Sequence, residues 1–71
     1  MRLLEEEKKA LVFFERYTNL LTSDLTNLKI TEVVKNLLVR LELISSRKNE
    51  FSGVWFYQIT NKGLLVLKSH L

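Results

Sequence analysis

The residues that decide the fold are Val54-Trp55-Phe56-Tyr57-Gln58-Ile59-Thr60-Asn61-Lys62-Gly63, which predict a β-strand that runs directly into a helix. Trp55, Tyr57 and Ile59 alternate with Phe56 and Gln58, and this two-residue period is typical of a half-buried strand. Thr60 is a suitable N-cap, because its hydroxyl can accept a hydrogen bond from an amide in the next turn. Gly63 lowers helix propensity, so we expect it to let the helix approach another backbone closely.

The residues before this strand predict three helices. Apolar residues recur at spacings of three and four through residues 3–21, which indicates a first helix with one broad apolar face. Thr22, Ser23 and Asp24 offer capping oxygens for a short helix over residues 24–28. Thr31 is the expected N-cap of a third helix, which we place over residues 31–41.

The third helix is expected to be amphipathic. Its predicted inner face consists of Val33, Val34, Leu37, Leu38 and Leu41, and its predicted outer face of Glu32, Lys35, Asn36, Val39 and Arg40. Residues 43–59 then predict a β-hairpin with its turn over residues 49–53, and residues 61–70 predict a last helix.

The end of the hairpin resembles a known family. Tyr57-Gln58-Ile59-Thr60-Asn61-Lys62-Gly63 resembles the closing segment of archaeal and viral winged-helix transcriptional regulators, in which the second wing strand ends in Tyr-x-Leu/Ile-Thr-x-Lys-Gly. The resemblance covers residues 23–68. It implies one α+β winged-helix domain over residues 1–71, with a three-helix helix-turn-helix core, a two-stranded wing over residues 43–59 and a C-terminal helix.

One segment departs from the family pattern. Leu41-Glu42-Leu43-Ile44 is similar to the exit of the family's recognition helix, which usually reads Leu-Gly-Leu-Ile. A glycine adopts the left-handed backbone conformation at low cost, whereas Glu42 does so with strain. We therefore expect the helix end to shift by one residue.

The resemblance implies that the third helix enters the major groove of DNA. On this helix Asn36 can pair bidentately with adenine, Lys35 can donate to guanine or phosphate, and Arg40 can meet the backbone. In the wing, Arg47 is the preferred phosphate or minor-groove contact. The predicted DNA-binding residues are Thr31, Lys35, Asn36, Arg40, Arg47 and Lys48.

Each of these roles has a simpler alternative. The outer face of the third helix can simply be its solvated side, with no ligand. Lys48 can simply prevent aggregation at an exposed edge strand. Trp55 and Tyr57 can stack on single-stranded bases, but their shared face with Ile59 favours packing against the core. For Phe51 we expect the ring to fold back onto the sheet, with contact to a partner as the alternative.

Composition and charge bound the possible functions. Residues 1–28 hold four basic and five acidic residues, and residues 29–71 hold seven basic and three acidic ones, so the positive charge lies in the predicted DNA-binding half. With no cysteine, one histidine and two glycines, the chain shows no nucleophile–base pair, metal constellation or phosphate-binding loop. We expect no enzyme activity, cofactor, metal or small-molecule ligand.

The apolar residues also indicate the cellular location of the chain and its oligomeric state. No apolar run approaches the roughly 18 residues that span a bilayer, so we expect no membrane segment and a cytoplasmic location, or the host cytoplasm for a viral protein. Leu64-Leu65-Val66-Leu67 covers more than one helix face, which suggests a homodimer through the first and last helices. The expected interface residues are Leu3, Leu4, Val12, Leu64, Leu67 and Leu71.

The sequence thus predicts a regulator that binds a specific double-stranded DNA site at a promoter. Two alternatives remain open. A winged helix can serve as a protein–protein interaction module, and it can also bind all duplexes alike as an architectural protein.

Overall fold

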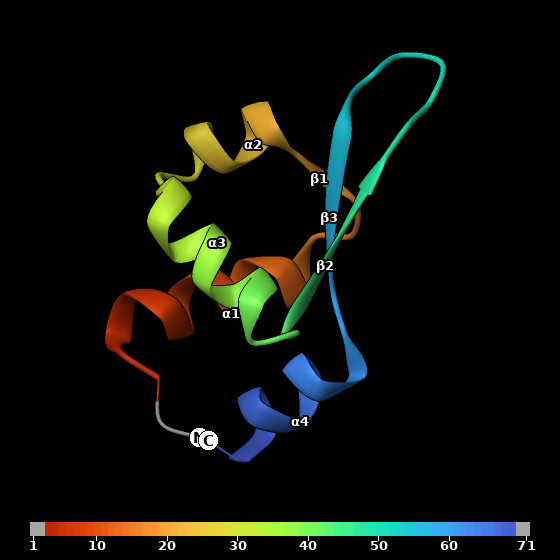
Figure 1. The fold of residues 1–71 in the computed structure, drawn as a ribbon. Coiled ribbons are helices and arrows are strands. Elements are labelled where there is room, and N and C mark those ends of the chain that lie inside the picture. The colour runs from red at the N-terminus through yellow and green to blue at the C-terminus, as the bar shows by residue number, and fades with distance from the viewer. Residues whose placement is uncertain (1–2, 70–71) are drawn as a thin grey trace.

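Among the residues that the structure describes, three helices precede a β-hairpin and one helix follows it. The computed structural model describes residues 3–69 (Figure 1). The elements in this range are α1 (Glu5–Arg16), β1 (Leu20–Leu21), α2 (Thr22–Asn27), α3 (Glu32–Arg40), β2 (Ile44–Lys48), β3 (Trp55–Ile59) and α4 (Asn61–Ser69). The expected end of the last helix at residue 70 lies outside the described residues.

The first helix is shorter than the predicted span of residues 3–21. Its start is stabilised by Glu7, whose carboxylate accepts a hydrogen bond from the Leu4 amide at 2.9 Å. It ends at Arg16, and Asn19 then adopts a left-handed conformation with φ 54°. After this turn Leu20 and Leu21 do not continue the helix. They are extended and pair with β3.

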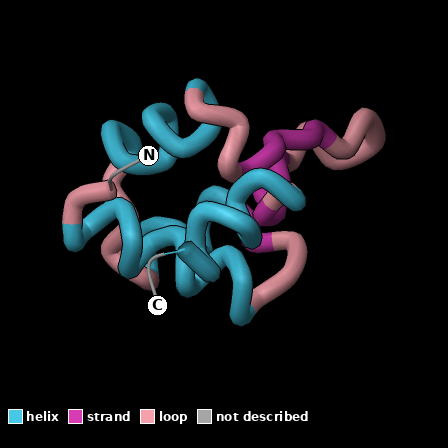
Figure 2. The backbone as a smooth tube through the Cα atoms, turned by 90° about the horizontal axis from the view of Figure 1, so that it is seen from below, coloured by secondary structure: helices cyan, strands magenta, loops and turns pink. Residues whose placement is uncertain are grey.

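The sheet has three strands in the described residues, where the sequence predicted two. The strand order is β1-β3-β2 and both pairings are antiparallel. The wing pairs Ile44 with Ile59 at its base and Lys48 with Trp55 at its outer end. Figure 2 shows the hairpin projecting away from the packed helices, so only its base belongs to the core.

The second helix begins at Thr22, two residues before the predicted start. Asp24 is its third residue, and its carboxylate accepts a hydrogen bond from the Leu21 amide at 2.9 Å, as in half of a capping box. At the other end the Ile30 amide donates to the Leu25 carbonyl at 2.8 Å, and Lys29 is left-handed with φ 60°. This Schellman motif ends the helix and turns the chain into α3.

The third helix begins as predicted and ends with a second Schellman motif. The Val34 amide donates to the Thr31 hydroxyl at 3.3 Å, which confirms Thr31 as the N-cap. The Leu43 amide donates to the Leu38 carbonyl at 2.9 Å, and Glu42 has φ 62°. The expected shift of the helix end is therefore wrong. Glu42 takes the left-handed position of the family's glycine and bears the strain of a side chain there.

The junction between β3 and α4 confirms both predictions made for it. The Gly63 amide donates to the Thr60 hydroxyl at 3.0 Å, so Thr60 is the N-cap. The Thr60 hydroxyl also lies 2.7 Å from the Glu42 carbonyl, to which it donates. A Cβ on Gly63 would overlap the carbonyl oxygen of Leu43 and lie 2.7 Å from the Ile59 side chain. The start of α4 thus rests directly on the backbone that follows α3.

The core lies where α1, α3 and the base of the wing meet. The largest fully buried side chains are Phe14, Leu11, Leu38, Leu43 and Ile44. Tyr57 and Leu67 join the same cluster, with 5% and 9% of their surface exposed. Leu67 was predicted at a dimer interface, but α4 turns it inward against the core and leaves little of it for a second chain.

The described residues hold no helix that is both long enough and apolar enough to cross a membrane.

Candidate nucleic-acid interface

Helix α3 presents a polar surface with one apolar side chain in it. The exposed residues of the helix are Glu32, Val33, Asn36 and Arg40. Val33 was predicted on the inner face, yet it is 78% exposed. Val39 was predicted on the outer face, yet it is half-buried and packs against the core. The helix is therefore rotated relative to the prediction, and Val33 stands on the outer surface with Asn36.

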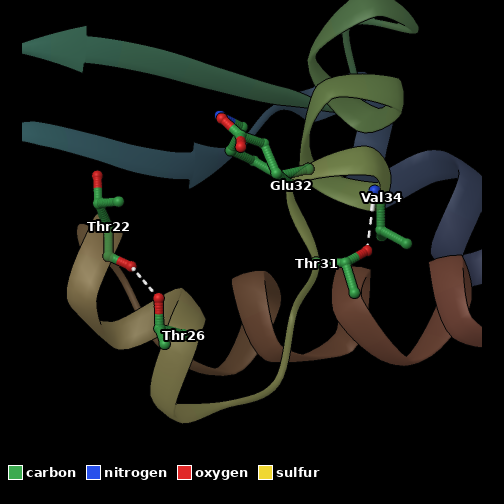
Figure 3. Close-up of polar contacts among 6 residues, drawn as sticks. Thr22, Thr26, Thr31, Glu32 and Val34 are labelled. Atoms are coloured by element: carbon green, nitrogen blue, oxygen red, sulfur yellow. Dashed lines mark hydrogen bonds and ion pairs between the residues drawn. The ribbon is translucent and has the colours of Figure 1, made fainter.

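Lys35 is held between α3 and the sheet. Its ammonium lies 3.6 Å from a carboxylate oxygen of Glu32 and 5.4 Å from the centre of the Tyr57 ring. Only 16% of its side chain is exposed, whereas that of Glu32 is 80% exposed. Figure 3 shows Glu32 turning from the first turn of α3 toward the strands. Lys35 is thus a positioned cation, and a ligand phosphate must compete with Glu32 for it.

A groove separates α3 from the wing. We call it the α3–wing groove; it is lined by Thr22, by Glu32, Lys35, Asn36 and Val39 of α3, and by Ser46, Trp55 and Tyr57 of the sheet. Hydroxyl, amide, ammonium, carboxylate and aromatic groups meet in it. Two of the predicted DNA-binding residues, Lys35 and Asn36, therefore share this groove with the wing.

Thr31 and Arg40 lie outside the groove. Thr31 is exposed at the start of α3 but lines a different hollow, beside Lys9 and Phe13 of α1. Its hydroxyl caps the helix, as the dashed line to Val34 in Figure 3 shows. Arg40 is the last residue of α3 and is exposed. The polar residues of α3 therefore extend along the whole helix, from its N-cap to its end.

The two basic residues of the wing face opposite sides. Lys48 pairs with Trp55 and Arg47 pairs with Phe56, and side chains of neighbouring strand residues point to opposite faces of a sheet. Trp55 lines the α3–wing groove, so Lys48 belongs to the groove side. Arg47 instead lines a hollow on the other side, with Leu21, Asp24 and Phe56 among its neighbours. The sequence could not show this division between the two cations.

Two of the three aromatic residues of β3, Tyr57 and Trp55, differ in their exposure. Tyr57 is buried, which confirms its predicted packing against the core. Trp55 is 44% exposed, so the same prediction is wrong for it. Trp55 lies at the outer end of the strand, opposite Lys48 and beyond the two residues of β3 that pair with β1. Its ring is therefore available on the groove side of the wing.

The wing tip is a closed turn with an outward aromatic side chain. The Asn49 side-chain oxygen accepts hydrogen bonds from the amides of Phe51 at 2.9 Å and Ser52 at 3.2 Å. The Asn49 amide donates to the Val54 carbonyl at 2.8 Å, and Gly53 supplies the left-handed conformation with φ 71°. The Phe51 side chain is fully exposed. Our expectation that it folds back onto the sheet is wrong.

Metal ligands do not cluster in the part of the chain that the structure describes, where no group of three or more His, Cys, Asp or Glu side chains could hold an ion. The candidate interface described above is built from polar, basic, aromatic and apolar groups together with the Glu32 carboxylate.

Comparison with known proteins identifies the fold. No protein-family model and no curated protein matches the sequence. Among solved structures, the chain is similar to a cysteine-to-serine mutant of ZitR from Lactococcus lactis, with a TM-score of 0.76 and 21% identity. The fold is a winged helix. The match covers 99% of this chain and 51% of the ZitR chain, so this chain spans about half of that protein. The α+β winged-helix fold class predicted from the sequence is confirmed.

Proposed function

We propose that this chain is a transcriptional regulator that binds a specific double-stranded DNA sequence at a promoter. The observation that carries the proposal is the exposed face of α3, on which Asn36 and Arg40 stand beside a wing with one cation on each side. The winged-helix fold that the chain shares with ZitR supports the same function.

In the proposed complex α3 lies in the major groove. The early residues of a recognition helix meet base edges there. Asn36 can pair bidentately with an adenine, and the exposed methyl groups of Val33 can contact the methyl group of a thymine. Glu32 can accept a hydrogen bond from cytosine, which would also release Lys35 toward guanine or phosphate.

The other predicted residues hold the phosphate backbone. Arg40 at the end of α3 and Thr31 at its start can each reach a phosphate beside the major groove. The wing then enters the neighbouring minor groove. The walls of that groove are the two phosphate strands, so Arg47 and Lys48, which face opposite sides of the wing, can each contact one strand.

The test is the salt dependence of binding to a labelled mixed-sequence duplex between about 50 and 200 mM salt. Each phosphate contact adds roughly 0.9 to the slope of log affinity against log salt. The double variant Arg47→Ala/Lys48→Ala should therefore bind more weakly and lower that slope by roughly 1.8. The matched control is Lys62→Ala/Lys68→Ala, which removes the same charge from the exposed surface of α4. Because α4 belongs to the proposed dimer surface described below, this control must keep the oligomeric mass of the parent chain.

The outcomes separate the candidate functions. An equal loss in both double variants would contradict the proposed face, because net charge alone would then explain it. No binding by the parent chain at the lowest salt would overturn the DNA function and favour a protein-interaction module. Equal affinity for every duplex, measured against a selected sequence pool, would favour a sequence-neutral architectural protein.

We further propose that the regulator is a homodimer formed through α1 and α4. Leu4 is 71% exposed and Val12 is 39% exposed on the α1 side, and Leu64 is half-buried on α4. Leu65, which is 67% exposed, replaces Leu67 in this set. Leu3 is half-buried and packs against the core, and Leu71 lies outside the described residues.

A two-fold axis through this surface would present two α3 helices to half-sites about 34–36 Å apart. Sedimentation equilibrium at tens of micromolar should give the mass of two chains, and Leu65→Glu should reduce it to that of one. A single-chain mass for the parent protein would contradict the dimer but not the DNA function.

A further inference from the structure

We propose that the wing tip is a wedge, in which Phe51 inserts between two stacked base pairs from the minor groove and bends the duplex. The inference rests on the proposed function and adds an activity to it, namely deformation of the DNA. It starts from a side chain that the fold does not use. The ring of Phe51 is fully exposed and contributes nothing to the core.

The tip presents this ring on an ordered support. The Asn49 side chain binds the amides of Phe51 and Ser52, and the Asn49 backbone closes the loop against Gly53 and Val54. These bonds fix the backbone on both sides of the ring before any ligand is present. A wedge needs such a support, because a flexible loop would lose conformational entropy on insertion and bind more weakly.

The wing is long enough to reach the neighbouring minor groove. Ser46 lines the α3–wing groove, and Phe51 follows it by five residues. At roughly 3.4 Å per residue the ring can stand at most about 17 Å beyond Ser46. The major and minor grooves alternate every half turn of duplex, which is also about 17 Å. With α3 in the major groove, a wing near this maximum reach places its tip at the edge of the neighbouring minor groove.

Charge near the tip favours the same position. Lys48 and Arg47 lie on opposite sides of the wing, just before the tip, where each can hold one wall of the minor groove. Apolar wedges such as phenylalanine partially unstack a base step there and kink the duplex toward the major groove. Glu50 adjoins Phe51 and opposes binding, since its carboxylate is repelled by the phosphates. The two flanking cations outnumber it.

The experiment measures bending without knowledge of the operator. Ligase-catalysed circularisation of a mixed-sequence fragment of about 120 base pairs is slow, because the fragment is shorter than the persistence length of about 150 base pairs. The parent chain should raise the rate of circle formation by about tenfold. Phe51→Ser should abolish the increase, when compared at equal occupancy followed by fluorescence anisotropy.

Three controls make the result specific to the ring. Phe51→Leu retains an apolar wedge and should retain most of the bending. Ser52→Ala removes from the tip only the 3.4 Å hydrogen bond that the Ser52 hydroxyl accepts from the Val54 amide, and it should retain most of the bending. Thermal melting of Phe51→Ser should match the parent chain, because the side chain is fully exposed.

Two results would overturn the wedge. Undiminished circularisation with Phe51→Ser would show that any bending comes from elsewhere, and binding by the parent chain with no faster circularisation would show that it does not bend DNA. The second result would leave the proposed function intact, whereas failure of the parent chain to bind the fragment at all would overturn both.

Discussion

Replacing Gly63 with alanine should lower the free energy of unfolding by about 3 kcal/mol or more. A Cβ at this position would overlap the Leu43 carbonyl oxygen and press on the Ile59 side chain. Neither the Leu43 carbonyl nor the Ile59 side chain can move away easily. The Leu43 carbonyl accepts a hydrogen bond from the Thr60 amide at 3.0 Å, and Thr60 itself caps α4 through its hydroxyl. The added methyl group must therefore separate α4 from the end of α3.

A loss of this size threatens the whole fold. A chain of this length is stable by only roughly 4–11 kcal/mol, at the usual 0.05–0.15 kcal/mol per residue. Urea denaturation followed by far-ultraviolet circular dichroism measures the loss, as a shift in the midpoint at constant slope.

The chain contains its own control for this substitution. Gly53→Ala adds the same methyl group at the wing tip, where nothing lies within 4 Å. Its cost comes only from the left-handed backbone, with φ 71°, and should be about 1 kcal/mol. If Gly63→Ala costs no more than Gly53→Ala, the close approach of α4 to Leu43 does not constrain the fold.

The junction at Gly63 was predictable because its signals are local. An alternating strand, a threonine cap and a glycine in the first turn all act within ten residues, and each reports on its own backbone. The same is true of Thr31, whose capping hydrogen bond the sequence also predicted. For the caps at Thr31 and Thr60, which depend on near neighbours, the sequence was sufficient.

The rotation of α3 was not predictable in this way. Apolar residues occur on both sides of the helix, because Val33 and Val39 flank the stripe formed by Val34, Leu37 and Leu38. Periodicity alone allows either valine to face the core. Packing against α1 and the sheet decides the matter, and it buries part of Val39 while leaving Val33 exposed. The apolar member of the candidate base-reading face was missed for this reason.

The positions of the candidate cations also depend on tertiary contacts that the sequence does not show. Lys35 has its place because the ring of Tyr57 lies beneath its ammonium, a contact between residues that are 22 positions apart. Arg47 and Lys48 are adjacent in sequence but opposite in space, and only the register with β3 shows which of them shares a face with Trp55. The sequence identified basic residues of the interface but not the direction of each.

Asn36→Ala should reduce the preference for the operator sequence without reducing general DNA binding. If Asn36 pairs with adenine, its loss removes about 1–3 kcal/mol of discrimination, which is roughly a 5- to 150-fold loss of affinity for the preferred duplex. Affinity for mixed-sequence DNA and the salt slope should remain unchanged, because no phosphate contact is lost. Competition between a selected duplex and mixed-sequence DNA measures the ratio directly.

Arg40→Ala provides the matched comparison, since both side chains are exposed on α3 one turn apart. Arg40 would meet phosphate, so its loss should weaken selected and mixed-sequence duplexes alike and lower the salt slope by about 0.9. The crossed result, with Asn36→Ala changing the salt slope and Arg40→Ala changing the sequence preference, would mean that α3 lies in the groove in another orientation.

Replacing thymines by uracils in the selected duplex tests the proposed contact of Val33, because this replacement removes only the thymine methyl group. The parent chain should lose affinity for the uracil duplex, and Val33→Ser, which removes both methyl groups of the side chain, should bind both duplexes equally.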